Sequence, residues 1–484
     1  MTTAASAAAP TREAVQARRP TPAALHILPF VLADALAVFV AAAFVVLVRY
    51  WLGGQFELAF YLRMSVVTAL FVLSYAVLGL YPAVALHPVA ELQSIFRGTT
   101  LTVLLLGTLT FFQRDAEAYS RAILLVSWVF INPAVWAART ALRGILGRTK
   151  WWGEQVVILG AGRAGRAVAN VLRNRPGSGL RVAAVLDDDP HKLALASDVA
   201  PLTAPLAAAE TLARSAGIRY AIVAMPSARG HELAAIVERH ASRFHHVFII
   251  PDLFGVSSLG VDARDIGGML GVKVSHRLLH FAPRVFKRTF DLVASIAGGL
   301  LLSPVWIAAY AAVRLTSRGP GLFAHTRIGR DGEPFRAWKF RTMIDGSSEV
   351  LEEYFGRHPG RRGEWERDRK LKSDPRITPV GRVLRRTSLD ELPQLWNIIR
   401  GEMSLVGPRP IVPEEMQKYG TRYSLYCKVR PGLTGLWQVS GRNNTTYDER
   451  VQFDEYYVRN WSVWLDIYIL ARTIKVVLTA EGAY

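Results

Sequence analysis

The stretch Gln155-Val-Val-Ile-Leu-Gly-Ala-Gly-Arg-Ala-Gly165 places a short β-rich run directly before three glycines. A helical segment follows, and the next β-rich run is Arg181–Leu186. Later β-rich runs cover Tyr220–Met225 and His246–Ile250, with helical sequence between them. Strands that alternate with helices predict a parallel sheet with helices on its faces. We therefore expect an α/β domain over residues 150–275.

The glycines of this turn have a mechanical interpretation. Gly160 permits a tight turn, Gly162 lets a pyrophosphate approach the backbone, and Gly165 allows the helix to pack closely on the sheet. Asp187 follows the second strand, where a Rossmann-like domain places the carboxylate that binds a ribose hydroxyl. These four residues are candidate nucleotide-binding residues. The same turn is needed simply to pack the helix, so a purely structural or regulatory domain is an equally good interpretation.

Four apolar runs precede this domain, in residues 25–148, after a tail of residues 1–24 that is expected to be disordered. The first run, Ile27–Val48, contains a single charge and, at about 1.5 Å per residue, can cross a hydrocarbon core of about 30 Å. The other three runs are Met64–Leu80, Phe96–Phe112 and Ala122–Ala138. We predict a bundle of four transmembrane helices. Buried helices of a large soluble core are the alternative.

Arginines flank the predicted bundle on both sides. Those before the first run are Arg12, Arg18 and Arg19, and those after the fourth are Arg139, Arg143 and Arg148. Because Lys and Arg are enriched on the cytoplasmic side of membrane proteins, both ends of the bundle are predicted to face the cytoplasm.

The composition of the chain supports a membrane protein. Of its 484 residues 51% are hydrophobic, and 58 Lys and Arg against 39 Asp and Glu give a formal charge of +19. A basic, apolar chain suits an anionic membrane surface or a phosphate-rich ligand, and we expect no nucleic-acid partner. The single cysteine, Cys427, excludes an internal disulfide and a zinc site built from several cysteines.

A fifth apolar run, within residues 287–314, is interrupted at its middle by Ser303-Pro304. Proline removes a backbone donor and breaks a helix, and Ser303 is a candidate partner for a carbonyl group freed at the break. Basic residues flank both ends of the run, which favours both ends on the cytoplasmic side. We predict a re-entrant helix that enters the membrane, bends at Ser303-Pro304 and returns. A kinked transmembrane helix is the alternative.

The candidate chemistry follows this helix, where Asp390-Glu391 lies among basic residues. Such a carboxylate pair can act as a nucleophile or base beside Mg²⁺, which needs few protein ligands because it keeps waters and substrate phosphates in its shell. Arg385, Arg386 and Arg409 offer forked donors to phosphate oxygens. On residue types alone, however, an Asp-Glu pair is usually the solvated start of a helix.

Five motifs surround this pair in order: Lys339–Met343, Ser373–Thr378, Thr387–Pro393, Gly401–Pro410 and Arg430–Gln438. Together they resemble the bacterial sugar transferases that load a phosphosugar onto polyprenyl phosphate, the monotopic phosphoglycosyl transferases. The resemblance covers a catalytic module over residues 284–484, expected to be mostly α-helical. Four membrane helices and a Rossmann-like domain ahead of it are similar to the large-form members. The family's re-entrant anchor also matches the break at Ser303-Pro304.

The resemblance implies a role for each residue of the motifs. Asp390 is implied to be the nucleophile that attacks the β-phosphate of a UDP-sugar, releases UMP and carries the phosphosugar as an aspartyl phosphate. Undecaprenyl phosphate then takes the phosphosugar. Glu391 is implied to hold Mg²⁺. The residues implied to bind phosphate oxygens or to assist are Arg385, Arg409, Lys339 and Arg341.

The identity of the sugar is inferred from a further resemblance. The segment Ser440–Arg450 looks closest to galactose-1-phosphate transferases, and Arg442 within it is expected to contact the sugar or the diphosphate. UDP-glucose and a UDP-N-acetylhexosamine are the alternative donors. Relatives of this kind start O-antigen, exopolysaccharide or capsule synthesis at the bacterial inner (cytoplasmic) membrane, with the catalytic module on the cytoplasmic face. A homodimer is one candidate assembly.

Two functions from other classes also fit parts of the chain. A membrane-bound nucleotide-sugar dehydratase or epimerase likewise joins membrane spans to a Rossmann-like domain, but its chemistry usually needs a Tyr-x-x-x-Lys pair, which this sequence lacks. A non-catalytic scaffold for polysaccharide export or transport is weakly supported, because the four apolar runs carry no line of intramembrane charges apart from Asp34.

Overall fold

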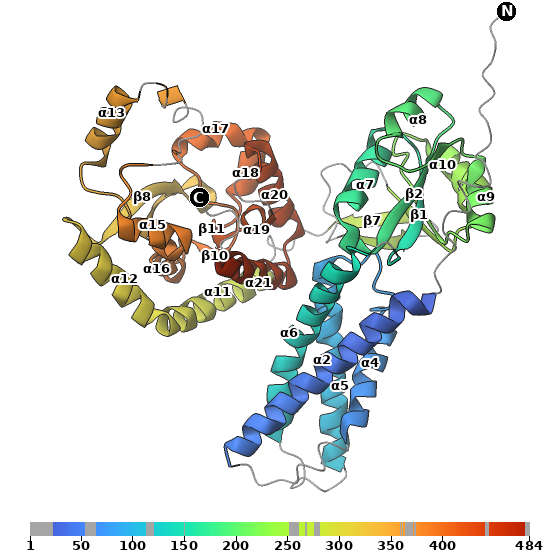
Figure 1. Ribbon diagram of the computed structural model, residues 1–484, viewed down its shortest axis with the longest axis horizontal. Helices are drawn as coiled ribbons and strands as arrows, with labels where there is room; N and C mark the ends of the chain where they lie inside the picture. Colours follow the sequence, from blue (N-terminus) through green and yellow to red (C-terminus); the bar gives the residue numbers. More distant parts are fainter. Residues whose placement is uncertain are drawn as a thin grey trace, which may run out of the picture. The chain divides into compact units, whose positions relative to one another are not determined.

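The computed structural model describes residues 23–53, 64–112, 121–149, 151–250, 261–266, 269–274, 281–358, 360, 362–363, 371, 374–440 and 445–479. The chain forms two compact units, Met1–Phe254 and Gly255–Tyr484. The first contains an apolar helical bundle and a parallel sheet, and the second contains the bent apolar helix and the candidate catalytic residues (Figure 1).

The bundle of the first unit has one helix at each predicted apolar run. Its helices are α2 (Ala23–Trp51), α4 (Thr68–Val77, after a 3₁₀ turn at Met64–Val67), α5 (Pro88–Phe112) and α6 (Arg121–Leu146). Helices α2, α5 and α6 are long and apolar enough to cross a membrane. Helix α4 has 10 residues, about 15 Å at 1.5 Å per residue, which is shorter than a hydrocarbon core. The prediction of four spanning helices is therefore not confirmed.

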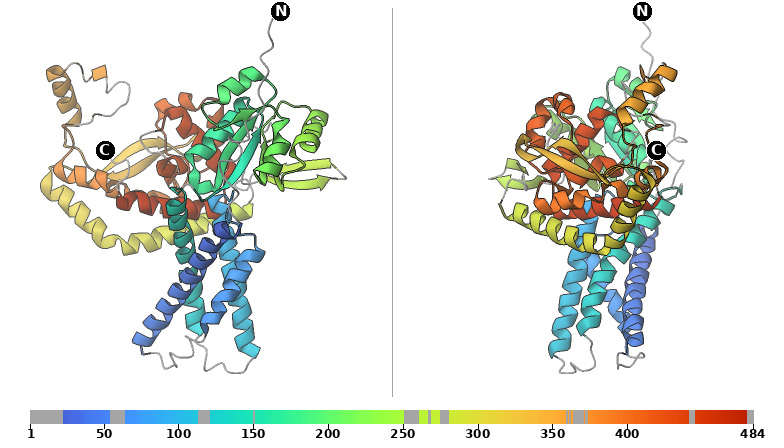
Figure 2. Two further views of the ribbon diagram at one scale, coloured as in Figure 1. Left: turned by 45° about the vertical axis from the view of Figure 1, so that its right-hand side comes forward. Right: turned by 90° about the vertical axis from the view of Figure 1, so that its left-hand side faces the viewer.

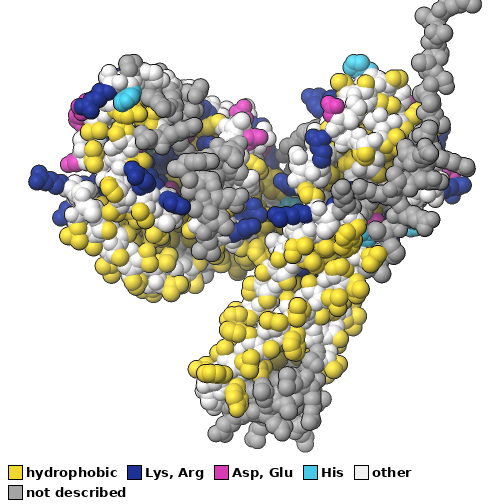
Figure 3. Space-filling view, viewed as in Figure 1, with side chains coloured by type: hydrophobic (Ala, Val, Ile, Leu, Met, Phe, Trp, Pro, Cys, Tyr) yellow, Lys and Arg dark blue, Asp and Glu magenta, His cyan; other side chains and the backbone are white. Residues whose placement is uncertain are grey.

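The bundle is apolar outside and charged inside. Large hydrophobic side chains such as Leu36 and Leu125 are more than 60% exposed, and Figure 3 shows the hydrophobic surface along the bundle. Asp34, Glu91 and Arg139 are buried in its interior. Such an arrangement suits a hydrocarbon surround, in which a charge is tolerated only when it faces a partner inside the protein.

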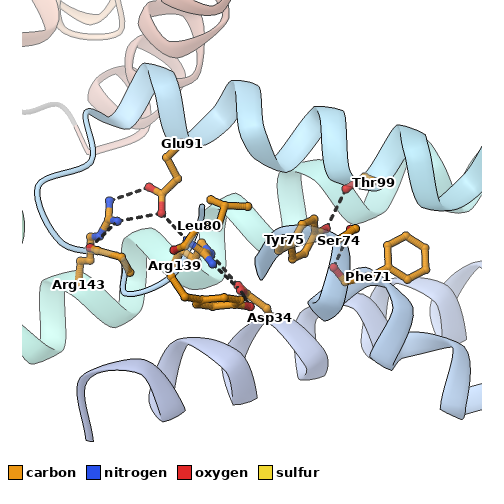
Figure 4. A network of polar contacts seen from close by, with 11 residues as sticks. Asp34, Phe71, Ser74, Tyr75, Leu80, Glu91, Thr99, Arg139 and Arg143 are labelled. Carbon is orange, nitrogen blue, oxygen red and sulfur yellow. Dashed lines mark hydrogen bonds and ion pairs between the residues drawn. The ribbon is translucent and has the colours of Figure 1, made fainter. Parts of the chain in front are cut away.

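An ion-pair network connects three helices of the bundle (Figure 4). Arg139 on α6 donates to Asp34 on α2 at 2.6 Å and to Glu91 on α5 at 2.8 Å. Arg143, one turn later, lies 2.6 Å from Glu91. Both arginines lie within α6, which extends to Leu146, so they are interior partners of acidic groups and not the free flanking charges that the sequence suggested.

The predicted α/β domain is present in the first unit. Its sheet has five parallel strands in the order β3-β2-β1-β4-β5. The strands are β1 (Glu154–Leu159), β2 (Leu180–Leu186), β3 (Thr203–Ala204), β4 (Tyr220–Val223) and β5 (His246–Ile249), and the helices are α7 (Arg163–Asn174), α8 (Pro190–Ala196), α9 (Ala208–Ser215) and α10 (Gly230–Ile236). Alternate residues of β1 enter two separate hydrophobic cores, so the sheet is covered on both faces.

The second unit is mostly α-helical, with short two-stranded sheets. Its strands form the pairs β6 (Val261–Ile266) with β7 (Met269–Val274), β8 (Leu322–Ile328) with β9 (Pro334–Phe340), and β10 (Ser404–Val406) with β11 (Gly432–Thr434). Its main helices are α11 (Phe281–Leu301), α12 (Ser303–Thr316), α13 (Ser347–Arg357), α15 (Pro379–Arg386), α16 (Gln394–Arg400), α17 (Met416–Tyr419), α18 (Tyr423–Tyr426), α19 (Leu436–Ser440), α20 (Tyr447–Asn460) and α21 (Val463–Thr479).

The fifth apolar run is two helices joined by a bend. Helices α11 and α12 meet at Leu302 with an angle of 64° between them (Figure 2). Pro304 lies in the first turn of α12, where a backbone N–H would have no acceptor within the helix, so proline is tolerated there. Ser303 Oγ donates to the carbonyl of Leu300 at 2.7 Å, which confirms the predicted partner for a carbonyl at the break.

Both arms of this bent pair are attached to the same folded unit. On α11, Arg288 donates to the carbonyl of Ile399 at the end of α16 at 2.8 Å, and Asp291 accepts from Ser404 on β10 at 2.7 Å. On α12, Ala309 and Val313 pack with Phe340 and Leu384. The bend itself is exposed, with Leu300 at 72% and Leu301 at 79%.

Candidate active site

Asp390 and Glu391 lie on a short 3₁₀ turn, η6 (Leu389–Glu391), between α15 and α16. Ser388, just before the turn, has a φ of +57°, a left-handed conformation that ends α15 and redirects the chain. Asp390 is buried, whereas the Glu391 side chain is 31% exposed. The pair is therefore held by a fixed backbone turn and is not a solvated helix start.

Helix α15 is fixed against Thr342, in the Lys339–Met343 motif. Thr378 caps the helix by accepting the N–H of Gly381 at 2.9 Å. A Cβ atom at Gly381 would lie 2.1 Å from the carbonyl oxygen of Thr342, so this close approach requires glycine. Arg385, two turns into the same helix, donates from Nε to Thr342 Oγ1 at 2.8 Å. These contacts fix the arginine beside the acidic pair.

Lys339, on β9, links the two acids. Its Nζ lies 2.5 Å from Glu391 Oε1 and 3.8 Å from Asp390 Oδ2. Burial is the main cause that raises the pKa of Asp390. The charge of Glu391 adds to the rise, the charges of Lys339 and Arg385 oppose it, and the resulting pKa is about 6. Both acids carry negative charge near neutrality, and Asp390 is the weaker acid.

The pKa of Glu391 moves in the other direction. Burial raises it, but the charges of Lys339, Arg409 and Arg327 outweigh burial and leave the pKa below its ordinary value. Glu391 therefore stays ionised over a wide pH range. Two neighbouring carboxylates with pKa values pushed apart are typical of sites in which each has a different role.

Arg409 is positioned by two glycines packed back to back. A Cβ atom at Gly432 would lie 2.1 Å from the backbone nitrogen of Gly407, so the motifs Gly401–Pro410 and Arg430–Gln438 can approach only at glycine. Gly407 N–H donates to the carbonyl of Thr434 at 3.0 Å, which continues the parallel pair β10–β11. The guanidinium of Arg409 then lies over the ring of Trp437, with Cζ 5.5 Å from the ring centroid.

The remaining predicted phosphate-binding residues differ in their surroundings. Arg341 donates to the carbonyl and hydroxyl oxygens of Ser317, at 2.9 and 2.6 Å, at the end of α12. These contacts join the end of the antiparallel pair β8–β9 to the end of α12 and give Arg341 a structural role. Arg386 follows Arg385 at the end of α15. Arg442 lies outside the described residues.

Two further cationic residues, one near Glu391 and one near Arg409, were not singled out from the sequence. Arg327, on β8, is close enough to Glu391 to lower its pKa, and Arg450, on α20, places its Cζ 4.8 Å from the centroid of Trp437. Arg450 belongs to the segment associated with sugar choice, which is a signal that could have identified it. Arg327 carries no comparable signal, because its proximity to the site depends on the pairing of Ile328 with Ile411.

The predicted glycine turn of the α/β domain is formed, and its acid is used within it. Gly160 has a φ of +109°, and a Cβ atom at Gly165 would lie 1.8 Å from the Gly160 carbonyl oxygen. The carboxylate of Asp187 accepts the N–H groups of Ala161 at 2.8 Å and Asp189 at 3.0 Å. Both glycines and the acid therefore serve the packing of α7 on the sheet, which favours the structural interpretation of the turn.

Oxygen ligands for a metal ion are present at Asp390 and Glu391. In the described part of the chain, no three His, Cys, Asp or Glu side chains are grouped to hold a metal ion. Two adjacent carboxylates leave most of a coordination shell to water and substrate phosphates. This donor set fits Mg²⁺ better than it fits a metal that needs a complete protein cage.

Comparison with known proteins gives a family for each unit. Residues 282–480 match the family described as bacterial sugar transferase, and residues 76–251 match a CoA-binding domain family. The chain is 38% identical over 397 residues to a UDP-galactose-lipid carrier transferase of Erwinia amylovora, covering 81% of this chain and 82% of that protein.

Two further relatives have similar coverage. An undecaprenyl-phosphate galactose phosphotransferase of Salmonella typhimurium is 37% identical, with 81% of this chain and 82% of the relative covered. A UDP-glucose:undecaprenyl-phosphate glucose-1-phosphate transferase of Escherichia coli is 31% identical, with 81% and 83% covered. Coverage of 81% of the chain includes parts of both units, and the five motifs fall within residues 282–480, which match the sugar transferase family. The chain therefore belongs to the bacterial sugar transferase family.

Proposed function

We propose that the protein transfers hexose-1-phosphate from a UDP-sugar to undecaprenyl phosphate and releases UMP. The observation that carries this proposal is the arrangement of Asp390, Glu391 and Lys339, a buried carboxylate beside an ionised one with an ammonium group between them. The names of the relatives agree with this reaction class. Two anionic substrates need cationic groups to approach one another, and the site supplies them.

In the first step the carboxylate of Asp390 attacks the β-phosphorus of the UDP-sugar. An Asp390–phosphorus bond forms, the bond from phosphorus to the bridging oxygen breaks, and UMP leaves with that oxygen and its electron pair. Burial favours the step because it removes water from the nucleophile and raises its basicity, while Lys339 and Arg385 keep it ionised.

In the second step a phosphate oxygen of undecaprenyl phosphate attacks the same phosphorus. The bond to Asp390 breaks, the carboxylate is regenerated, and the product is a polyprenyl diphosphosugar. No water or redox partner enters the balance. Two successive displacements at one carboxylate keep the two anionic substrates from having to react with each other directly.

Glu391 is proposed to hold Mg²⁺, which, when bound, neutralises charge on the diphosphate. Its lowered pKa keeps the carboxylate ionised and available as an oxygen ligand. In the structure Lys339 Nζ donates to Glu391 Oε1. Lys339 thereby holds Glu391 in place and leaves its second oxygen for another partner.

The proposed donor is UDP-galactose. The Erwinia amylovora and Salmonella typhimurium relatives, whose names include galactose, are 38% and 37% identical to the chain. The Escherichia coli glucose-1-phosphate transferase is 31% identical. UDP-glucose and UDP-N-acetylhexosamines are the alternatives. The product would start O-antigen, exopolysaccharide or capsule synthesis.

Helices α11 and α12 are proposed to form a re-entrant element in the bacterial inner membrane, with the catalytic unit at the cytoplasmic face. The support is that both arms pack on one folded unit while the bend exposes Leu300 and Leu301. A spanning helix would have its two ends on opposite sides of the membrane, and one folded unit cannot contact both.

The test is incubation of the purified full chain with labelled UDP-galactose, Mg²⁺ and undecaprenyl phosphate. The expected result is release of UMP together with label in the lipid fraction. An oxidised or dehydrated sugar without UMP would instead identify a dehydratase or epimerase and would overturn the proposal. A parallel panel with UDP-glucose and UDP-N-acetylhexosamines assigns the sugar.

A further inference from the structure

Two arginines from separate elements lie over the ring of Trp437, and a third lies beside one of them. Arg409 follows β10 and Arg450 is on α20, and their Cζ atoms lie 5.5 and 4.8 Å from the centroid of the indole ring. Arg327, on β8, donates from Nη1 to the carbonyl of Pro410 at 3.3 Å, next to Arg409 in the chain. We call Arg327, Arg409 and Arg450 the arginine cluster.

The arginine cluster is not neutralised by ion pairs. Among the residues that the structure describes, Arg327, Arg409 and Arg450 have no carboxylate oxygen within 4.0 Å, whereas Arg376 and Arg459 each bind one. Burial lowers the pKa of Arg327 and of Arg450, the charge of Arg409 lowers both further, and the charge of Glu415 opposes the change. Like charges that are held together without a direct ion pair create a site that favours an anion.

A second observation also points to an anionic ligand. Trp437 is 4% exposed, and within the described residues its Nε1 has no hydrogen-bond partner. The hydroxyl of Tyr447, on the first turn of α20, is likewise buried without a partner there, and Lys418 Nζ lies 5.0 Å from its ring. Buried donors are rarely left unpaired. Two buried donors beside the cluster, Trp437 Nε1 and the Tyr447 hydroxyl, thus lack an acceptor among the described residues.

We propose that Arg327, Arg409 and Arg450, with Trp437 Nε1, bind the oxygens of a phosphate ester that is not the phosphorus under attack. This inference rests on the proposed function and adds Arg327, Arg450 and Trp437 to the residues that contact substrate. The ligand chemistry is a phosphoryl oxyanion. It has two sources, the α-phosphate of the nucleotide donor and the phosphate of the polyprenyl acceptor.

Proximity to the acidic pair supports this placement. Arg327 is on β8, which pairs with β9, the strand that carries Lys339. The indole ring of Trp437 supports the guanidinium groups of Arg409 and Arg450, which leaves their forked N–H donors available for oxygen ligands.

The test compares Arg450→Gln with Arg459→Gln, a matched change on the same helix at a residue that pairs with Glu455. One arm measures the burst of UMP from UDP-galactose without lipid acceptor. The other measures transfer from the preformed adduct to undecaprenyl phosphate. Loss of a charge-assisted contact is expected to weaken the affected step about ten- to a hundredfold.

Each result has a defined meaning. A raised KM for the nucleotide sugar in the first arm identifies the donor phosphate, and a raised KM for the lipid in the second identifies the acceptor phosphate. Constants within twofold of both wild type and Arg459→Gln in both arms overturn the proposal. If Arg450→Gln does not fold, Arg450→Lys is the second variant. It keeps the positive charge but lacks the forked guanidinium donors, so the affected step should weaken to an intermediate extent.

A binding measurement separates this inference from the proposed reaction. Calorimetric titration of UDP and of inorganic pyrophosphate into wild type, Arg450→Gln and Arg459→Gln needs no turnover. Weaker binding in Arg450→Gln alone supports the site even if no phosphosugar transfer is found. Equal binding of both anions by all three proteins, together with unchanged KM values, counts against the site even if phosphosugar transfer is found.

Discussion

Lys339 Nζ contacts Glu391 Oε1 at 2.5 Å and lies 3.8 Å from Asp390 Oδ2, so one ammonium group acts on two carboxylates of unequal burial. The closer carboxylate is the stronger acid, and the more buried one has its pKa raised to about 6. This asymmetry supports the proposal that Asp390 is the nucleophile and Glu391 the ionised metal ligand.

Replacement of the proposed nucleophile should abolish turnover. Asp390→Asn keeps the shape of the side chain but cannot form the acyl phosphate, so we expect a rate loss of at least about a thousandfold with unchanged membrane insertion. Mass spectrometry of wild type stopped during turnover should find a phosphohexose on the peptide that contains Asp390, and none in the variant. Wild-type rates in Asp390→Asn would refute the assignment.

The activity should fall on the acidic side of pH 6. The proposed nucleophile is the carboxylate of Asp390, and because its pKa is raised to about 6, its charged form is lost at a higher pH than that of an ordinary aspartate. Below this value kcat/KM for UMP release should decrease about tenfold per pH unit. Initial rates between pH 4 and 8 test this, and a half-maximal point near pH 4 would contradict it.

Replacement of Lys339 should shift the acid limb of the pH–activity profile to higher pH. In Lys339→Met the attraction that keeps Asp390 and Glu391 ionised is lost, so the limb of the pH profile should rise by about one unit. Lys428→Met, at an exposed lysine of the same unit, is the control. A variant with lower activity but an unchanged limb would show that Lys339 acts only through binding.

The two arms of the bent helix should be accessible from one side of the membrane. In a Cys427→Ser background, Phe281→Cys and Leu315→Cys place thiols at exposed positions, 80% and 86%, on the two arms. A membrane-impermeant maleimide should label both from the cytoplasmic side, and a fluorophore at Leu301→Cys should be quenched by lipid-bound quenchers. Labelling of the two arms from opposite sides would establish a spanning helix.

The charge network of the bundle should be essential for stability. Arg139→Met leaves Asp34 and Glu91 buried without their central cation, a change that costs about 3–5 kcal/mol for a buried ion pair. Arg148→Met, at an exposed residue after the same helix, should change the stability little. Thermal unfolding in detergent compares them. Equal midpoints would show that the network is dispensable.

Local features of the chain were determined by the sequence itself. The alternation of strands and helices after residue 150, the turn at Gly160 and the break at Ser303-Pro304 all follow from side-chain periodicity, glycine conformation and the missing N–H of proline. The order of the motifs also identified the family. These properties depend on neighbouring residues, so they can be read without knowing the fold.

The tertiary structure decided how distant residues combine. Arg139 pairs with Asp34 across 105 residues, Lys339 reaches Glu391 across 52, and Arg450 shares the ring of Trp437 with Arg409. It also made α4 too short to span and directed Arg341 to Ser317. Burial and charge act through space, so pKa values and ion pairs depend on packing that no local pattern specifies.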